Sequence, residues 1–219
     1  MWMFSIVFKE YRVLLPLLIG GILLLGMCMI NAMGIDLLNG QWGRPGSIPF
    51  YTFEIYQMYA FVSVCLAGIC GLWQVQSELQ GGTWLYLWHR PVSRRKITSA
   101  KLASGMILVW VVTGIPLLLY ALWAVMPQSV PAPFLWQNTA IYFKCWLGIS
   151  VMYFAGYLTG MRSGSWLGTR LFPLIPAALL SLFVMMTIHY YWLSIMVIVL
   201  FNVICCLAIF RQIEMEDYS

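Results

Sequence analysis

Long, uninterrupted apolar stretches are the feature that most limits what this chain can fold into. Six such stretches occur, at residues 13–33, 55–75, 102–126, 139–161, 171–188 and 191–210. A helix needs roughly 20 apolar residues to cross about 30 Å of hydrocarbon. Charged residues make up only 9% of the chain, which excludes a water-soluble enzyme and a disordered protein. We therefore expect an all-α, polytopic membrane protein with six transmembrane helices.

The basic residues outside these stretches predict the orientation of the chain. Lys9, Arg12 and Arg211 flank the first and last spans, and other cations lie between spans two and three and between spans four and five. With six spans, Arg44 alone falls on the opposite side. Because short cytoplasmic loops carry the excess of Lys and Arg, we expect both termini in the cytoplasm. The net charge of +5 then indicates contact with lipid headgroups rather than with nucleic acid.

The remaining segments are too short for a second folded domain, so we expect one transmembrane domain over residues 1–219. Residues 1–12, MWMFSIVFKEYR, suit a short helix lying in the cytoplasmic interface; a frayed terminus with an aromatic anchor is the alternative. Pro173 and Pro176 predict an irregular or kinked entry into the fifth span.

Small residues four positions apart predict where helices pack closely. The motifs are Ala67-x-x-x-Gly71 in the second span and Gly156-x-x-x-Gly160 in the fourth. Small side chains let two helix backbones approach each other in a membrane. The motifs therefore indicate close packing within the chain or, alternatively, a subunit interface.

The cytoplasmic segment 78–101, ELQGGTWLYLWHRPVSRRKITSAK, carries the most information. Gly81 and Gly82 break the second helix, and Thr83 can cap a short helix over residues 83–89. That short helix has more apolar side chains than a solvent-facing turn needs, which predicts contact with the membrane surface or with a protein partner. The apolar residues are Trp84, Leu85, Leu87 and Trp88.

The third span is preceded by a cluster of cations. Arg94, Arg95 and Lys96 fall in the first turn of the predicted helix, where positive charge opposes the helix macrodipole. Lipid phosphates or an acidic partner must stabilise these cations at the start of the helix. The acidic tail that begins at Glu214 is either a solvated end or a contact for a partner ATPase or for this basic helix start.

The order of residues in segment 78–101 resembles the signature of type-2 ABC transporter (exporter) permeases. That signature has an acidic residue, a Gly-Thr pair, a leucine-rich stretch, an Arg-Pro-Val-Ser-Arg turn and a final Lys. Here these elements are Glu78, Gly82-Thr83, residues 84–89, Arg90-Pro91-Val92-Ser93-Arg94 and Lys101. Lys9-Glu10 also looks like part of the elbow helix of this family, and the six-span layout with both ends inside is similar.

The resemblance implies a permease subunit without catalytic residues of its own. Residues 83–89, ending at His89, would be the coupling helix that docks on a separate ATPase, with Glu78 and Arg94 anchoring the region. ATP and Mg would bind to that ATPase, because this chain has no G-x-x-x-x-G-K-[ST] loop. A second permease copy or a different permease would complete the transport path as a homo- or heterodimer.

The resemblance also implies a cellular location and a transported substrate. We expect a multi-pass protein of a bacterial inner or plasma membrane that exports a drug, an antimicrobial peptide or a lipid. The connection between the last two spans is much shorter than in many relatives. A non-transporting scaffold or regulatory subunit, which pairs with a sister permease or an ATPase, is therefore the alternative.

One charged residue falls inside a predicted span. Lys144 lies near the outer end of the fourth span, and Glu54 begins the second span at a similar depth. An ionisable residue inside hydrocarbon is a functional candidate whose partner has to be named. We predict a Lys144–Glu54 pair that lines an outer vestibule; snorkelling of Lys144 to the interface is the alternative. No metal site is expected.

Overall fold

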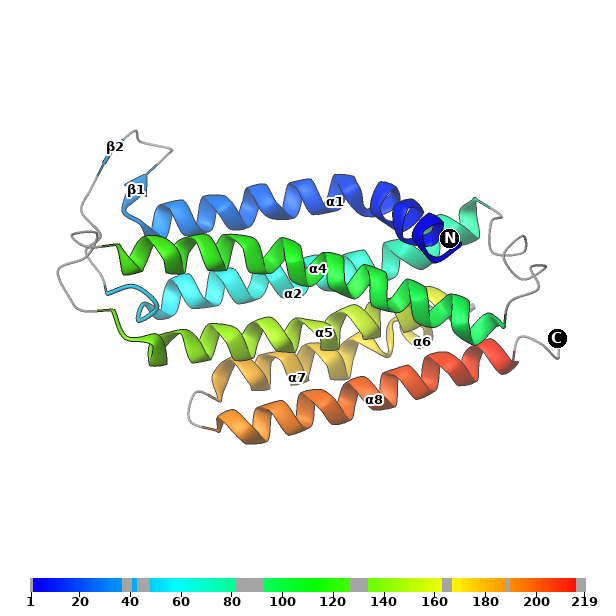
Figure 1. Ribbon diagram of the computed structural model, residues 1–219. Helices are drawn as coiled ribbons and strands as arrows, with labels where there is room; N and C mark the ends of the chain where they lie inside the picture. Colours follow the sequence, from blue (N-terminus) through cyan, green and yellow to red (C-terminus); the bar gives the residue numbers. More distant parts are fainter. Residues whose placement is uncertain are drawn as a thin grey trace.

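The computed structural model is a bundle of long helices that run roughly along one common direction (Figure 1). It describes residues 2–36, 41–42, 48–81, 93–126, 134–162, 167–187 and 190–215. The long helices are α1 (Trp2–Ala32), α2 (Phe53–Gln80), α4 (Arg94–Val125), α5 (Ala140–Met161), α7 (Leu174–Met186) and α8 (Tyr191–Met215).

Six helical segments in the described residues are long and apolar enough to cross a membrane. They are Phe8–Ala32, Phe53–Gln80, Arg94–Val125, Trp136–Met161, Gly168–Met186 and Tyr191–Glu214. This confirms the all-helical prediction with six crossing helices. The only sheet in the described part of the chain is a minimal antiparallel pair, β1 (Ile35–Asp36) with β2 (Gln41–Trp42).

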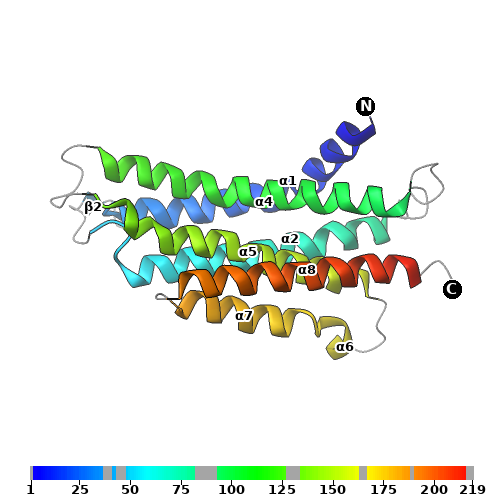
Figure 2. The ribbon, with the colours of Figure 1, turned by 60° about the horizontal axis from the view of Figure 1, so that its bottom comes forward.

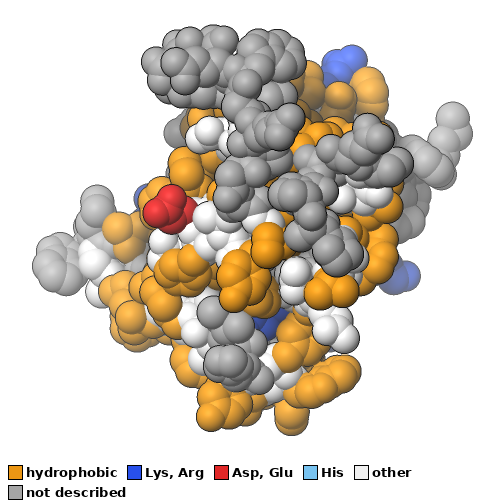
Figure 3. Space-filling model, turned by 90° about the vertical axis from the view of Figure 1, so that its left-hand side faces the viewer, with side chains coloured by type: hydrophobic (Ala, Val, Ile, Leu, Met, Phe, Trp, Pro, Cys, Tyr) orange, Lys and Arg blue, Asp and Glu red, His pale blue; other side chains and the backbone are white. Residues whose placement is uncertain are grey.

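The two ends of the bundle have different compositions. The start of α1, the end of α2, the start of α4 and the end of α8 lie together (Figure 1), and we call this the terminal end. Apart from Lys144, the described Lys and Arg residues belong to these segments, to the residue that follows α5 or to the short helix α6 (Leu167–Leu171), which lies at the same end (Figure 1). Figure 3 looks onto the opposite end, where hydrophobic side chains predominate and charged ones are sparse.

Helix α1 is continuous from Trp2 to Ala32, and its first turns point away from the bundle (Figure 2). Pro16 lies inside the helix. A proline at this place removes one main-chain hydrogen bond and pushes against the carbonyl four residues earlier, which accounts for the bend. The structure therefore joins the predicted interfacial segment 1–12 to the first span without an interruption.

Helices α2 and α5 form the centre of the bundle, and glycines bring their backbones together. A Cβ atom added at Gly71 would collide with the carbonyl of Tyr153, and one added at Gly156 would collide with the carbonyl of Gly68. At Gly160, an added Cβ would lie 2.8 Å from the Cβ of Val75. The small-residue motifs of the two spans therefore pack against each other within one chain.

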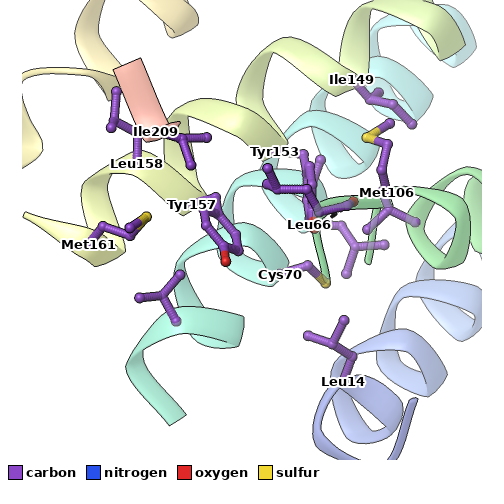
Figure 4. Packing of buried hydrophobic residues seen from close by; sticks show 14 of the residues in the cluster. Leu14, Leu66, Cys70, Met106, Ile149, Tyr153, Tyr157, Leu158, Met161 and Ile209 are labelled. Atoms are coloured by element: carbon purple, nitrogen blue, oxygen red, sulfur yellow. Dashed lines mark hydrogen bonds between the residues drawn. The ribbon is translucent and has the colours of Figure 1, made fainter. Parts of the chain in front are cut away.

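Aromatic and aliphatic side chains fill the interior around this central pair. Tyr153 and Tyr157 are fully buried among Leu14, Cys70 and Met106 (Figure 4). The outward faces of α1, α4, α7 and α8 expose large apolar side chains, as expected for helices that face lipid.

The fifth span enters irregularly, as the prolines predicted. A short helix, α6 (Leu167–Leu171), is followed by a turn, and α7 begins after Pro173. Helix α7 has 13 residues, which is about 20 Å at 1.5 Å per residue. Because the hydrocarbon core is about 30 Å thick, α7 needs α6 and the turn to cover the remaining distance.

Candidate functional site

A buried carboxylate near the end of α2 organises the terminal end of the bundle. Glu78 is only 3% exposed and forms salt bridges to two lysines from different helices. The Nζ atom of Lys9, on α1, lies 2.8 Å from its Oε1 atom. The Nζ atom of Lys101, on α4, contacts Oε2. Glu78 therefore ties α1, α2 and α4 together through charge.

A second carboxylate makes this a four-charge cluster. Glu10 is 1% exposed, and its charge faces those of Lys101, Glu78 and Lys9. The cluster thus holds two acids and two bases, of which Glu10, Glu78 and Lys101 are buried and Lys9 is partly exposed. A buried charge without a partner is costly, so the equal numbers of the two signs make this arrangement tolerable.

A layer of neutral hydrogen bonds lies next to the charges. The amide Nε2 of Gln74 donates to the carbonyl of Lys101 at 3.1 Å. The hydroxyl of Tyr153, on α5, donates to Oε1 of Gln74 at 2.7 Å and lies 3.2 Å from the carbonyl of Leu102. These bonds connect α2, α4 and the central helix α5. We refer to Lys9, Glu10, Gln74, Glu78, Lys101 and Tyr153 as the terminal polar network.

Local sequence spacing explains why these residues meet. Gln74 and Glu78 are four residues apart and share one face of α2. Gly105 lies one turn after Lys101 on α4, and an added Cβ there would collide with the Tyr153 hydroxyl and with Gln74. A glycine at this position therefore makes room for the polar layer.

The comparison with known families decides what kind of protein carries this network. A family model described as ABC-2 family transporter protein matches residues 12–205. The chain belongs to this family. No curated protein and no solved structure matches it. The family match and the six apolar helices describe a multi-pass membrane component of an ABC-2 transporter, in agreement with the resemblance drawn from segment 78–101.

The segment with the predicted coupling residues is only partly described in this ABC-2 protein. Gly82, Thr83, Trp84, Leu85, Leu87, Trp88 and His89 lie outside the described residues, so the coupling helix stays a prediction. Both ends of the segment are described: Gly81 caps α2, and Ser93 precedes Arg94, the half-buried first residue of α4. The first and last residues of the signature, Glu78 and Lys101, form a salt bridge.

The structure does not bring together the two residues predicted to line an outer vestibule. The Lys144 side chain is buried, and its Nζ atom donates to the carbonyl of Thr187, next to the end of α7. Glu54 is exposed at the start of α2. No salt bridge joins them, although both are among the described residues. A role for Glu54 in a vestibule stays a prediction.

Sequence reasoning named Glu78 but did not foresee its partners. In the sequence, Lys9 and Lys101 indicate only cytoplasmic charge and parts of a family pattern. The available signal was Gln74, a polar residue one helical turn before Glu78 in an apolar stretch. A polar residue inside a span usually hydrogen-bonds to another helix, so Gln74 and Glu78 together indicate a polar seam on one face of α2.

Proposed function

We propose that this ABC-2 family protein is the membrane-spanning permease subunit of an ATP-driven exporter and works with a separate ATPase. The observation that carries the proposal is the family match over residues 12–205, together with the ion pair between Glu78 and Lys101. Export of a drug, an antimicrobial peptide or a lipid is the activity that the resemblance implies. Both termini and the basic residues of the terminal end would face the cytoplasm, where the ATPase would bind.

The terminal polar network supports a route from the ATPase to the spans. Glu78 lies close to the end of α2, and Lys101 lies two turns into α4, so their ion pair spans the base of segment 82–92. A force on the proposed coupling helix, residues 83–89, would act on both helices at once. Through Gln74 and Tyr153 it would reach α5 in the middle of the bundle.

A dimer is part of the proposal, because a transport path between two such bundles needs a second permease. The partner would be a second copy or a different permease. A non-transporting scaffold or regulatory subunit is the second candidate, favoured by the short connection between α7 and α8. Both candidates need an ATPase or a sister permease, so isolation of the complex comes first.

The first experiment purifies the tagged chain from its host in mild detergent, identifies the proteins that come with it and measures ATP hydrolysis. We expect an ATPase in stoichiometric amount and ATP hydrolysis that rises in the presence of substrate. A stable complex that contains an ATPase but transports nothing after reconstitution would favour the scaffold. A complex without an ATPase and without ATP hydrolysis would overturn the exporter proposal and leave the scaffold or regulatory subunit.

The second experiment tests coupling itself. Glu78→Ala and Gly82→Val should separate ATP hydrolysis from transport while the protein remains in the membrane. Loss of Glu78 alone also leaves the buried Lys101 and the partly exposed Lys9 without this partner, so the charge-balanced double variant Glu78→Met/Lys101→Met serves as a stability control. Normal substrate-stimulated hydrolysis and transport in all three variants would contradict the proposed coupling role.

A further inference from the structure

A groove between α4 and α8 at the terminal end belongs to no part of the proposed coupling route. Its mouth has a volume of about 720 Å³. Basic residues from both helices, Arg95 and Lys96 on α4 and Arg211 on α8, line it together with Glu214. Leu207 and Phe210 add apolar surface to its lining.

The groove continues into the apolar part of the bundle. A second hollow of about 330 Å³ shares Ser99 and Phe210 with the first, so the two lie next to each other. Its deeper walls are Met106, Trp110 and Cys206 with neighbouring apolar side chains. The basic mouth thus opens onto an apolar channel between the same two helices.

The length of the apolar part matches one leaflet of a bilayer. Ser99, Ala103, Met106 and Trp110 follow each other at three- or four-residue intervals and form a stripe along α4. From Ser99 to Trp110 the helix rises by about 16 Å. That is about half of a hydrocarbon core of about 30 Å, the depth that one acyl chain occupies.

The charge at the mouth favours an anion. Arg95 forms a salt bridge with Glu214, as one reading of the acidic tail predicted. Within the described part of the chain, Lys96 and Arg211 form no salt bridge. The positive end of the α4 macrodipole lies at the same place, so Lys96 adds positive charge to an already positive helix end. An anionic group bound at the mouth would relieve this repulsion.

We propose that this groove binds an anionic phospholipid of the leaflet at the terminal end. The phosphate lies between Lys96 and Arg211, and one acyl chain lies along the stripe from Ser99 to Trp110. Basic pockets between transmembrane helices recognise acidic headgroups in this way. The same groove has an apolar wall for the tail, which a free phosphate ion would not need.

The test measures which lipid stays on the protein. The purified full chain is mixed with equal amounts of dioleoylphosphatidylglycerol and dioleoylphosphatidylcholine, which differ only in the headgroup, and bound lipid is counted by native mass spectrometry. We expect the wild-type protein to retain phosphatidylglycerol preferentially. Lys96→Gln/Arg211→Gln should lower this preference by about fivefold for each charge removed.

Two matched controls separate the groove from the general basic surface. Arg12→Gln/Arg170→Gln removes the same charge at the same end but outside the groove and should leave the preference unchanged. Ala103→Phe fills the apolar channel and should reduce retained phosphatidylglycerol, whereas Val111→Phe, at an exposed α4 position outside the groove, should not. Elution as a single species in detergent shows that a variant is folded, and Lys96→Gln alone replaces the double variant if that one aggregates.

Three results would overturn the proposal. They are equal retention of both lipids by the wild-type protein, the same loss of preference in Arg12→Gln/Arg170→Gln, and an unchanged preference in Lys96→Gln/Arg211→Gln. The second result would mean a general electrostatic attraction to the membrane surface. The third result would mean that the groove binds a second copy of the chain or another protein instead of a lipid.

Discussion

The two ends of the bundle accommodate buried charge in different ways. At the terminal end, Glu78 pairs with Lys9 and Lys101, so one side chain neutralises another. At the opposite end, Lys144 donates to a main-chain carbonyl beside the end of α7. A helix C-terminus carries a partial negative charge of about half an elementary charge. The backbone at the end of α7 therefore supplies the partner of the Lys144 charge. The terminal end therefore depends on side-chain identity far more than the opposite end does.

At the opposite end, packed aromatic rings take the place of side-chain ion pairs. The ring of Phe50 is 5% exposed and lies 4.7 Å from the ring of Tyr120 and 5.0 Å from that of Tyr142. Its backbone has a φ of 63°, a conformation that is uncommon for a residue with a large side chain. The strained backbone is retained because it inserts this ring between α4 and α5.

The largest expected effect comes from breaking the charge balance at the terminal end. Glu78→Met should lower the free energy of unfolding by about 3–5 kcal/mol, because it leaves buried lysine charge without its partner. The double variant Glu78→Met/Lys101→Met should recover most of this loss, since one acid and one base remain. Thermal unfolding in mild detergent, followed by tryptophan fluorescence, measures both. A double variant as unstable as the single one would show that the loss is not electrostatic.

The next prediction concerns the aromatic packing around Phe50 at the opposite end. Phe50→Ala should destabilise the protein by about 3 kcal/mol, because it removes a buried ring and leaves a cavity. Phe53→Ala is the matched control, since that ring is 46% exposed, and it should change stability little. The Phe50 effect should be the same in low and high salt. A strong salt dependence would mean that charge, rather than packing, holds this end.

This contrast also explains how much could be read from the sequence. Continuous apolar stretches, proline positions and small-residue motifs report local constraints. They predicted six helices and the irregular entry of α7, and they indicated close helix packing at the glycines of α2 and α5 without naming the helix that each glycine meets. The family was evident from the order of residues in segment 78–101. None of these signals depends on knowing which distant residues meet.

The partners of the buried charges could not be read in the same way. Lys144 was predicted to pair with Glu54 at a similar depth, but depth does not define the direction around a helix. A main-chain carbonyl such as that of Thr187 leaves no mark in the sequence as an acceptor. Lys9 reaches Glu78 across 69 positions, and this meeting depends on the path of α1.

A smaller effect is expected for the buried lysine at the opposite end. Lys144→Met should cost about 1 kcal/mol, the usual net value of one hydrogen bond, because the methionine fills the same space and no carboxylate loses its partner. Glu54→Gln should be silent, and the two changes should add without coupling. A coupling energy above about 1 kcal/mol in this double-mutant cycle would show that the predicted Glu54–Lys144 pair forms after all.

The smallest effect separates the two lysines that share Glu78. The Lys9 side chain is 37% exposed, whereas that of Lys101 is 2% exposed. Water and salt screen a pair with such an exposed partner, so Lys9→Gln should cost about 0.5 kcal/mol and less at high salt. Glu78 keeps Lys101 in that variant, so its charge stays neutralised. If Lys9→Gln were as damaging as Glu78→Met, α1 would contribute as much to the terminal polar network as the pairing of α2 with α4.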